Sequence, residues 1–320
     1  MRPGHVVSVL VAMSLLVVAA CSKTDNPVDP GTVSPGGSSG SSGSSVDDPT
    51  LPDGAPNPAF DGGSSSGGDA GPPSAGCGAP ATGGYKTNQT ISVGGQSRVY
   101  SIQIPSPYDP NKRYPVIFGF HGDGGDGSSA RDAFKFESLE KNAIYVYPNG
   151  LNTTFDLDTW DPGKNKDVML VDALAASIKK TYCVAEARFF LAGYSRGGFF
   201  ANHVACMRGG VFRAAASHSG GGPYGPDSAY DGNGDLVCPG KPIAVIVLIG
   251  SNDGLLSDST ESRKYWTKRY KCSGTTAAAP SPCLASTGCT TPFKWCQIPG
   301  LGHQVWSSGP QAILGFFAAQ

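Results

Sequence analysis

Gly193-Tyr194-Ser195-Arg196-Gly197-Gly198 separates an apolar run at residues 187–192 from a run with helical spacing at residues 199–207. A serine hydroxyl is a weak nucleophile unless a tight strand-to-helix turn exposes it to a base and to backbone N–H groups. Glycines flank this serine because such a turn crowds strand against helix and leaves no room for a Cβ. The order of strand, turn and helix favours a nucleophile elbow over a glycine-rich turn that holds an ordinary serine.

Strand-length apolar runs alternate with helical stretches through the C-terminal three quarters of the chain. The buried runs are expected at 116–120, 143–147, 189–192, 214–217 and 243–249. Helical spacing occurs at 168–182, 199–207 and 259–270. Residues 97–104 alternate as an edge strand that Pro105 and Pro107 end. The pattern predicts an α/β fold of one catalytic domain, with a mostly parallel sheet and helices on both faces.

The base that would activate Ser195 is expected to be one of the five histidines of the chain. Reactive groups lie in loops beyond the carboxyl ends of parallel strands, so each histidine can be judged by its position. The candidates are His5, His121, His203, His218 and His303. His5 lies in the leader, and His203 lies about two turns down the helix, where packing is its expected role. His218 ends a strand and could line the pocket, but it precedes any plausible acid. The order of serine, acid and histidine found in α/β-hydrolases selects His303.

The acid is expected directly after the strand at 243–249, the only strong strand between Ser195 and His303. Asp253 follows that strand and would hold the imidazole in its correct tautomer. Asp258 is the competitor, at an expected helix N-cap before Ser259. Its position five residues farther along favours Asp253.

An oxyanion needs two backbone donors, and two glycine-rich turns can supply them. The sequence predicts the N–H of Arg196, directly after the serine, and that of Asp123 in His121-Gly122-Asp123-Gly124-Gly125. His121 itself is expected to be structural. Three aromatic residues, Trp160, Tyr194 and Trp306, could stack on a phenolic acyl group or a sugar, or could simply cover the core.

The N-terminal part does not have the composition of a folded domain. Residues 1–21 read as a signal peptide, and Val18-Ala19-Ala20-Cys21 resembles a lipoprotein signal whose cysteine is lipidated. Residues 22–76 are rich in Ser, Gly, Pro and Asp and are expected to be a disordered linker. Residues 77–320 form the predicted domain, whose weak and scattered charge excludes nucleic acid as an expected partner.

Eight cysteines follow Cys21, and an even number in an exported chain favours disulfides. Cys183 and Cys206 are the preferred pair, because both are expected at the bottom of the sheet. No C-x-x-C pair occurs, so no metal site is expected. Asp231-Gly232-Asn233-Gly234-Asp235 alternates oxygen ligands like a calcium loop, but Leu236 and Pro242 replace the required glycine and glutamate. A polar surface turn is favoured there.

Several further motifs carry a family resemblance over most of residues 77–320. They are Gly76-Cys77-Gly78, Arg98-Val99-Tyr100, Pro105-Ser106-Pro107-Tyr108-Asp109, Asp167-Val168, Tyr182-Cys183-Val184 and Leu301-Gly302-His303-Gln304-Val305-Trp306. With the elbow, the chain resembles the secreted esterase family of polyhydroxybutyrate depolymerases, bacterial lipoprotein esterases and feruloyl or acetylxylan esterases. The resemblance implies Ser195 as nucleophile, Asp253 as acid and His303 as base. Ile249-Gly250, where the family often has His-Gly, and the surroundings of Trp160 depart from it.

These expectations describe an exported or surface-anchored monomeric serine esterase that needs no cofactor. The first substrate class is feruloyl or acetyl esters on plant cell-wall xylan. Polyhydroxyalkanoate is the second class and peptides, for a serine peptidase of related fold, the third. A carbohydrate-binding surface lipoprotein without turnover is the alternative of another kind. The membrane is expected to be a partner only through a lipid on Cys21 of a bacterial protein.

Overall fold

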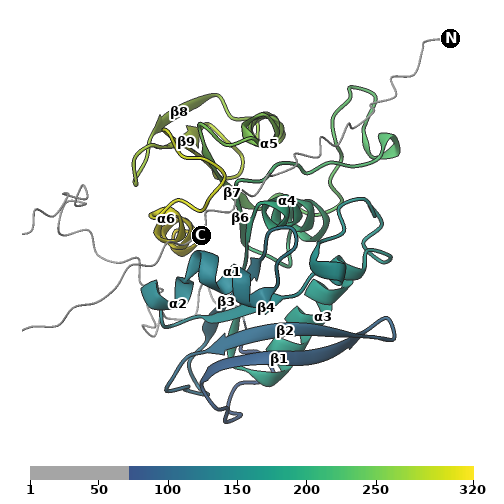
Figure 1. The fold of residues 1–320 in the computed structure, drawn as a ribbon, viewed down its shortest axis with the longest axis vertical. Helices are drawn as coiled ribbons and strands as arrows, with labels where there is room; N and C mark the ends of the chain where they lie inside the picture. The colour runs from purple at the N-terminus through teal and green to yellow at the C-terminus, as the bar shows by residue number, and fades with distance from the viewer. Residues whose placement is uncertain (1–71) are drawn as a thin grey trace, which may run out of the picture. The chain divides into compact units, whose positions relative to one another are not determined.

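The computed structural model describes residues 72–320, and Figure 1 shows their arrangement. The predicted leader, lipidated Cys21 and most of the proposed linker lie outside the described residues. Ser74 and Gly76, at the end of that linker, hydrogen-bond to the carbonyls of Tyr182 and Lys179. Contacts with the folded part therefore begin a few residues before Cys77.

A ten-stranded sheet forms the centre of the described chain, in the order β1-β2-β4-β3-β5-β6-β7-β10-β9-β8. Its strands are β1 (Gly84–Val93), β2 (Gln96–Ile104), β3 (Tyr114–Phe120), β4 (Ile144–Pro148), β5 (Val184–Tyr194), β6 (Ala214–His218), β7 (Ala244–Gly250), β8 (Gly274–Ala277), β9 (Cys283–Thr287) and β10 (Phe293–Ile298). The six strands from β4 to β10 in this order pair in parallel, and the two strands at each end pair antiparallel. The parallel strands β3, β4, β6 and β7 are buried along their whole length, as strands covered on both faces must be.

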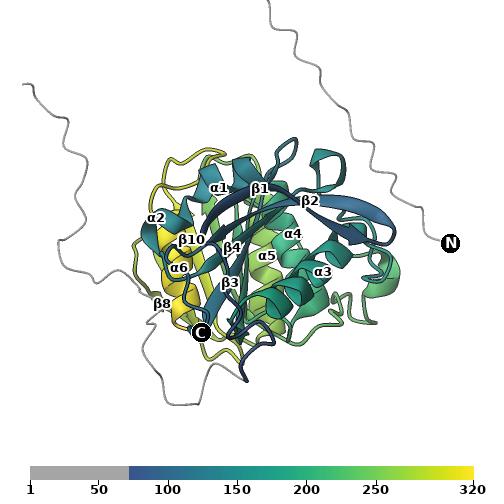
Figure 2. The ribbon, with the colours of Figure 1, turned by 90° about the horizontal axis from the view of Figure 1, so that it is seen from below.

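Helices cover both faces of the sheet, and Figure 2 shows α1, α2 and α6 on one side and α3, α4 and α5 on the other. Their bounds are α1 (Gly127–Phe134), α2 (Phe136–Leu139), α3 (Lys166–Thr181), α4 (Arg196–Arg208), α5 (Leu256–Arg269) and α6 (Gly309–Ala318), with short 3₁₀ turns η1 (Leu151–Thr153) and η2 (Asp227–Ala229). Each face of the sheet has its own apolar core, so the predicted α/β-hydrolase architecture is confirmed.

Residues 97–104 do not form the edge strand expected from their alternation. They lie in β2, which pairs with β4 on one side and with β1 on the other. β1 escaped prediction because it holds few large apolar residues and is exposed at several positions. The sequence of β1, the outermost strand, is therefore too polar to be recognised as a strand. The alternating pattern of β2, its inner neighbour, is instead typical of an edge strand.

The predicted Cys183–Cys206 disulfide is wrong. Cys183 bonds to Cys77, and Cys206 bonds to Cys238, with Cα separations of 4.0 and 4.8 Å. In each pair, the partner cysteine lies on a segment outside β5 and α4. Residues 74–76, just before Cys77, hydrogen-bond to the end of α3 next to Cys183. The N–H of Gly240, just after Cys238, donates to the carbonyl of Cys206. The remaining pairs are Cys272–Cys289 and Cys283–Cys296.

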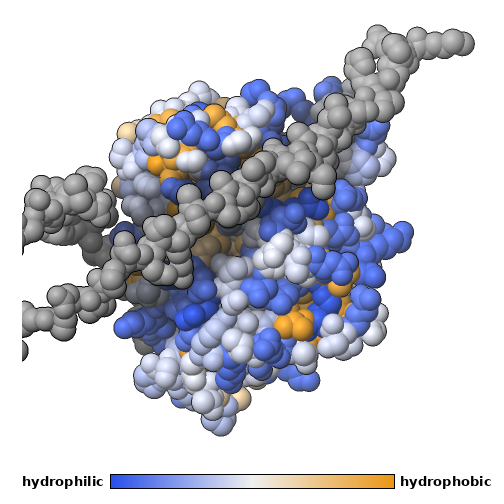
Figure 3. Space-filling view, viewed as in Figure 1, coloured by the Kyte–Doolittle hydropathy of each residue, from blue (hydrophilic) through white to orange (hydrophobic). Residues whose placement is uncertain are grey.

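Polar residues predominate on the face of the described chain that Figure 3 shows. Apolar residues form small separate patches on that face. Within residues 72–320, no helix combines the length and apolar character needed to cross a bilayer.

Candidate active site

Ser195 occupies a strained turn between β5 and α4. Its φ of 55° and ψ of −122° lie outside the regions that ordinary residues adopt. A Cβ on Gly193 would approach the carbonyl oxygen of Gly197 to 1.9 Å, and one on Gly197 would approach that of Phe120 to 2.3 Å. The two glycines thus permit the strand and helix to close around the serine, and the strain at Ser195 marks a functional position.

Three side chains that the sequence placed on separate loops meet at this turn. Nε2 of His303 lies 2.9 Å from Oγ of Ser195. Nδ1 of His303 lies 2.9 and 3.0 Å from the two carboxylate oxygens of Asp253. The geometry fits a serine that passes its proton to an imidazole which a carboxylate orients.

Burial differs sharply along this chain of hydrogen bonds. The side chain of Asp253 is fully buried, whereas that of His303 is 41% exposed. Asp253 also accepts the N–H of Leu255, which fixes the carboxylate at the end of β7. Asp253 is therefore held in place away from water, while the imidazole of His303 is partly exposed to solvent.

Asp258 does not sit at the N-cap expected for it. Helix α5 begins at Leu256, so Asp258 lies within the first turn, and its carboxylate accepts the hydroxyl of Tyr224 at 3.2 Å. The helix starts earlier because the backbone N–H of Leu256 closes a turn onto the carbonyl of Asp253. The structure brings Asp253 to His303 and gives Asp258 another partner.

The glycine-rich loop after β3 lies close to Ser195. A Cβ on Gly122 would lie 3.4 Å from that of Ser195. Within residues 72–320, the backbone N–H groups of Asp123 and Arg196 donate to no protein acceptor. Both N–H groups are therefore available to an acceptor on a bound molecule.

Comparison with known proteins shows which family this chain belongs to. A family model described as a putative esterase matches residues 92–273, more than half of the chain. Feruloyl esterase C of Emericella nidulans is 34% identical over 267 residues, which cover 77% of this chain and 91% of the relative. This chain belongs to the esterase family. It is a serine carboxylic-ester hydrolase.

Further relatives agree with this assignment. A probable feruloyl esterase C of Aspergillus terreus is 30% identical over 246 residues, covering 72% of this chain and 83% of the relative. The solved acetyl xylan esterase from Aspergillus awamori superimposes with a TM-score of 0.58 at 16% identity, covering 72% of this esterase and 98% of that chain. The latter likeness shows a shared fold.

His121 holds the glycine-rich loop of the esterase, the structural role that the sequence predicted. Its Nε2 accepts the N–H of Gly150 at 3.0 Å, so the ring proton lies on Nδ1, which faces the carbonyl of Gly122 at 2.7 Å. Burial lowers the pKa of His121 and keeps the ring neutral. The ring therefore links the loop after β3 to the loop after β4.

His203 and His218 are buried, and burial lowers their pKa values to about 4 and about 3. His203 packs against the Trp160 ring with 5.6 Å between ring centroids, on the face of α4 that the sequence assigned to packing. His218 ends β6 and binds the loop of His303, because its Nε2 accepts the N–H of Trp306 at 2.9 Å. The sequence indicated only that His218 ends a strand where it could line the pocket, and did not predict its contact with Trp306.

The three predicted pocket aromatics lie in different environments. The Tyr194 hydroxyl donates to the carbonyl of His303 at 2.9 Å, and its ring lies 5.2 Å from the imidazole. Burial and the charge of Asp253 raise its pKa, which keeps the hydroxyl protonated. Tyr194 also lines a cavity of about 280 Å³ with the loop at 121–125. Trp160 and Trp306 do not line that cavity, and both pack against core residues.

A buried ion pair supports the loop beside the serine, and sequence reasoning did not detect it. Arg98 on β2 pairs with Asp167 in the first turn of α3, and both side chains are almost fully buried. The other carboxylate oxygen of Asp167 accepts the N–H of Asp156 at 2.8 Å. The carbonyl of the adjacent Phe155 accepts the N–H of Arg196 Nε, so the ion pair is connected to the residue after Ser195. Arg98-Val99-Tyr100 and Asp167-Val168, two separate motifs in the sequence, thus meet in space.

The Asp231–Asp235 segment forms a turn closed by its own first side chain. Oδ1 of Asp231 accepts the N–H groups of Asn233 and Asp235 at 2.8 and 3.0 Å. Asp235 forms an ion pair with Lys268 of α5. Among residues 72–320, no group of three or more His, Cys, Asp or Glu side chains could hold a metal ion.

Proposed function

We propose that this esterase hydrolyses feruloyl or acetyl esters on plant cell-wall xylan through an acyl-serine intermediate. The carrying observation is the hydrogen-bonded series Ser195–His303–Asp253 at a strained strand-to-helix turn. The substrate class is supported by two relatives that are named as feruloyl esterases. This chain matches most of the length of each.

In the first half of the reaction, the Ser195 proton moves to Nε2 of His303 while Oγ attacks the ester carbonyl. The Asp253 carboxylate stabilises the imidazolium that forms. The N–H groups of Asp123 and Arg196 bind the oxyanion, and loss of one such donor typically raises the barrier by about 2.7–4 kcal/mol. The carbon–oxygen bond to the sugar then breaks, and the imidazolium returns its proton to the leaving alcohol.

In the second half, His303 takes a proton from water, and the resulting hydroxide attacks the acyl carbon. The second tetrahedral intermediate collapses to the free acid, and the imidazolium of His303 returns its proton to Oγ of Ser195. Apart from the ester and water, each step uses only side chains and backbone amides of this chain.

Four disulfides among residues 72–320 support an extracellular location, because disulfides persist in oxidising compartments. Export by the leader and a lipid on Cys21 would hold a monomeric enzyme at the surface of a bacterium. A flexible linker would then give the domain reach toward an insoluble polymer.

A substrate panel tests the proposed function. Methyl ferulate, acetylated xylan, polyhydroxybutyrate and short nitrophenyl esters are compared for the full chain and for Ser195→Ala. Turnover of ferulate or acetylxylan, lost in Ser195→Ala with folding intact, is expected. Preference for polyhydroxybutyrate would shift the substrate class to polyesters. A Ser195 that no fluorophosphonate probe labels would instead point to a carbohydrate-binding protein without turnover.

A further inference from the structure

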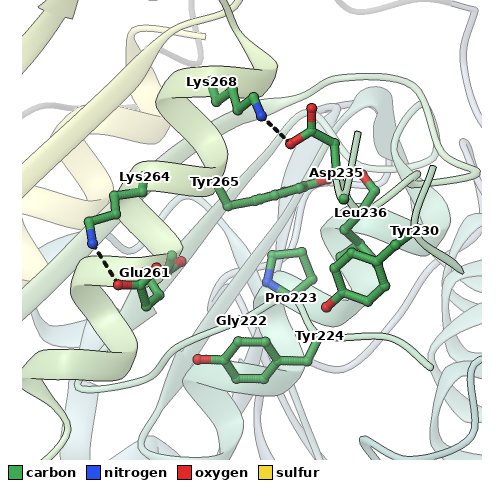
Figure 4. Close-up of a pocket in the computed structure, with 12 residues that line it drawn as sticks. Gly222, Pro223, Tyr224, Tyr230, Asp235, Leu236, Glu261, Lys264, Tyr265 and Lys268 are labelled. Carbon is green, nitrogen blue, oxygen red and sulfur yellow. Dashed lines mark hydrogen bonds and ion pairs between the residues drawn. The ribbon is translucent and has the colours of Figure 1, made fainter. Parts of the chain in front are cut away.

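Exposed large hydrophobic side chains gather in the loop between β6 and β7. The large hydrophobic residues that are exposed within residues 72–320 are Val211, Tyr224, Tyr230 and Val237. All but Val211 belong to the segment between β6 and β7. Tyr224 and Tyr230 are 44% and 37% exposed and line a cavity of about 260 Å³ beside α5. Figure 4 shows their rings, with Tyr265 and Pro223, around this cavity.

Internal bonds hold this loop in one shape. The turn closed by Asp231, the bond from the N–H of Val237 to the carbonyl of Ala229, and the Cys206–Cys238 disulfide all constrain it. The Tyr265 hydroxyl lies 2.7 Å from Sγ of Cys238, which fixes a further wall. A cavity whose walls are already ordered loses little conformational entropy when a ligand binds.

The charged groups at the cavity neutralise one another. Glu261 pairs with Lys264 at 2.7 Å, and Asp235 pairs with Lys268, as the dashed lines in Figure 4 mark. These pairs leave aromatic faces and hydrogen-bonding groups but no uncompensated charge. Such a lining fits a neutral, hydroxyl-rich ligand better than an ionic one.

The cavity adjoins the first turn of α4. Phe199 lies four residues after Ser195 on α4, roughly 6 Å of helical rise, and its ring lies 6.1 Å from that of Tyr224. These two rings also line a smaller hollow of about 20 Å³ with buried His203. Nε2 of His203 has no hydrogen-bond partner, so a polar group, water or a ligand hydroxyl, is expected in that hollow.

We propose that this aromatic cavity, defined by Tyr224, Tyr230 and Tyr265, is a carbohydrate subsite. It binds neutral sugar units of the xylan chain whose ester lies at Ser195, with the exposed tyrosine rings as stacking faces. The Tyr230 hydroxyl, which has no protein partner among the described residues, is available to a sugar hydroxyl. The inference rests on the proposed function and extends it from the ester to the polymer.

The test compares a feruloylated xylo-oligosaccharide with methyl ferulate. Tyr230→Ala and Tyr224→Ala are expected to raise KM for the oligosaccharide roughly three- to tenfold, with kcat and both constants for methyl ferulate unchanged. Tyr230→Phe, which keeps the ring, should retain most of the affinity. Val237→Ala is the matched control, because Val237 is 55% exposed in the same loop but does not line the cavity.

Direct binding separates this inference from the proposed function. Xylohexaose is titrated into full-chain Ser195→Ala, with and without Tyr230→Ala, by calorimetry. Binding that Tyr230→Ala weakens supports the subsite even if no feruloyl or acetyl ester proves to be a substrate. Equal binding in both variants, or equal KM changes for the oligosaccharide and methyl ferulate, would overturn the subsite while leaving the ester chemistry intact.

Discussion

The backbone N–H of Trp306 donates a hydrogen bond to Nε2 of His218 across 2.9 Å. The carbonyl of the same histidine accepts the N–H of Ser195, also at 2.9 Å. One buried residue at the end of β6 therefore binds both the turn at Ser195 and the loop that carries His303. Because Nε2 is the acceptor, the ring is neutral, with its proton on Nδ1 toward the Ser219 hydroxyl.

Replacing His218 with Leu should lower kcat for a nitrophenyl ester about 10- to 100-fold, because the loop of His303 loses its anchor and the imidazole its alignment. His218→Gln, whose side-chain oxygen can accept the Trp306 N–H, should recover much of the rate. Circular dichroism and thermal unfolding monitor folding of both variants. Full activity in a folded His218→Leu variant would show that the loop is held by other contacts.

Asp253→Asn should lower kcat for a short nitrophenyl ester by about 10³- to 10⁴-fold, because an amide cannot stabilise the imidazolium of His303. Asp258→Asn should leave that rate nearly unchanged, since its carboxylate binds Tyr224 instead. Steady-state kinetics on the two purified variants decide between the carboxylates. The reverse ranking would reassign the acid.

Arg98→Met should lower the free energy of unfolding by about 3–5 kcal/mol, because it leaves the Asp167 carboxylate buried without its cation. Lys164→Met is the comparison: Lys164 pairs with Asp161 at the exposed surface, where such a pair contributes at most about 1 kcal/mol. Urea denaturation of both variants measures the difference. Equal losses would mean that burial does not set the strength of the Arg98–Asp167 pair.

The buried histidines predict loss of stability in mild acid. Burial lowers the pKa values of His203 and His218 to about 4 and about 3, so the native rings stay neutral at pH 5 while the unfolded chain takes up protons below about pH 6.5. Stability is fully present above about pH 6.5 and falls with the pH, by up to about 1.4 kcal/mol per unit for each histidine. Urea denaturation between pH 7 and pH 5 measures the slope.

His203→Leu should reduce that slope by about one proton, because the variant lacks the ring that takes up a proton when the chain unfolds. An unchanged slope would show that His203 is protonated equally in the folded and unfolded chain.

Features that depend on residues adjacent in the chain could be predicted from the sequence. The elbow follows from a strand, a glycine-flanked serine and a helix in direct succession, and β3, β4, β6 and β7 follow from short apolar runs. β1 could not be predicted, because its stability comes from pairing with β2 and not from its own apolar pattern. The start of α5 was misplaced for a similar reason, since a turn onto Asp253 begins that helix before the expected N-cap.

The sequence by itself determined the fold class and singled out Ser195, Asp253 and His303, because local patterns and the direction of parallel strands place these residues in loops beyond strands. Only the tertiary structure decided which cysteines pair, that Arg98 meets Asp167, and that His218 anchors the loop of His303. It also decided that tyrosines from two distant segments share one cavity. These contacts join residues far apart in the chain, and their geometry is set by how the helices and loops pack on the sheet.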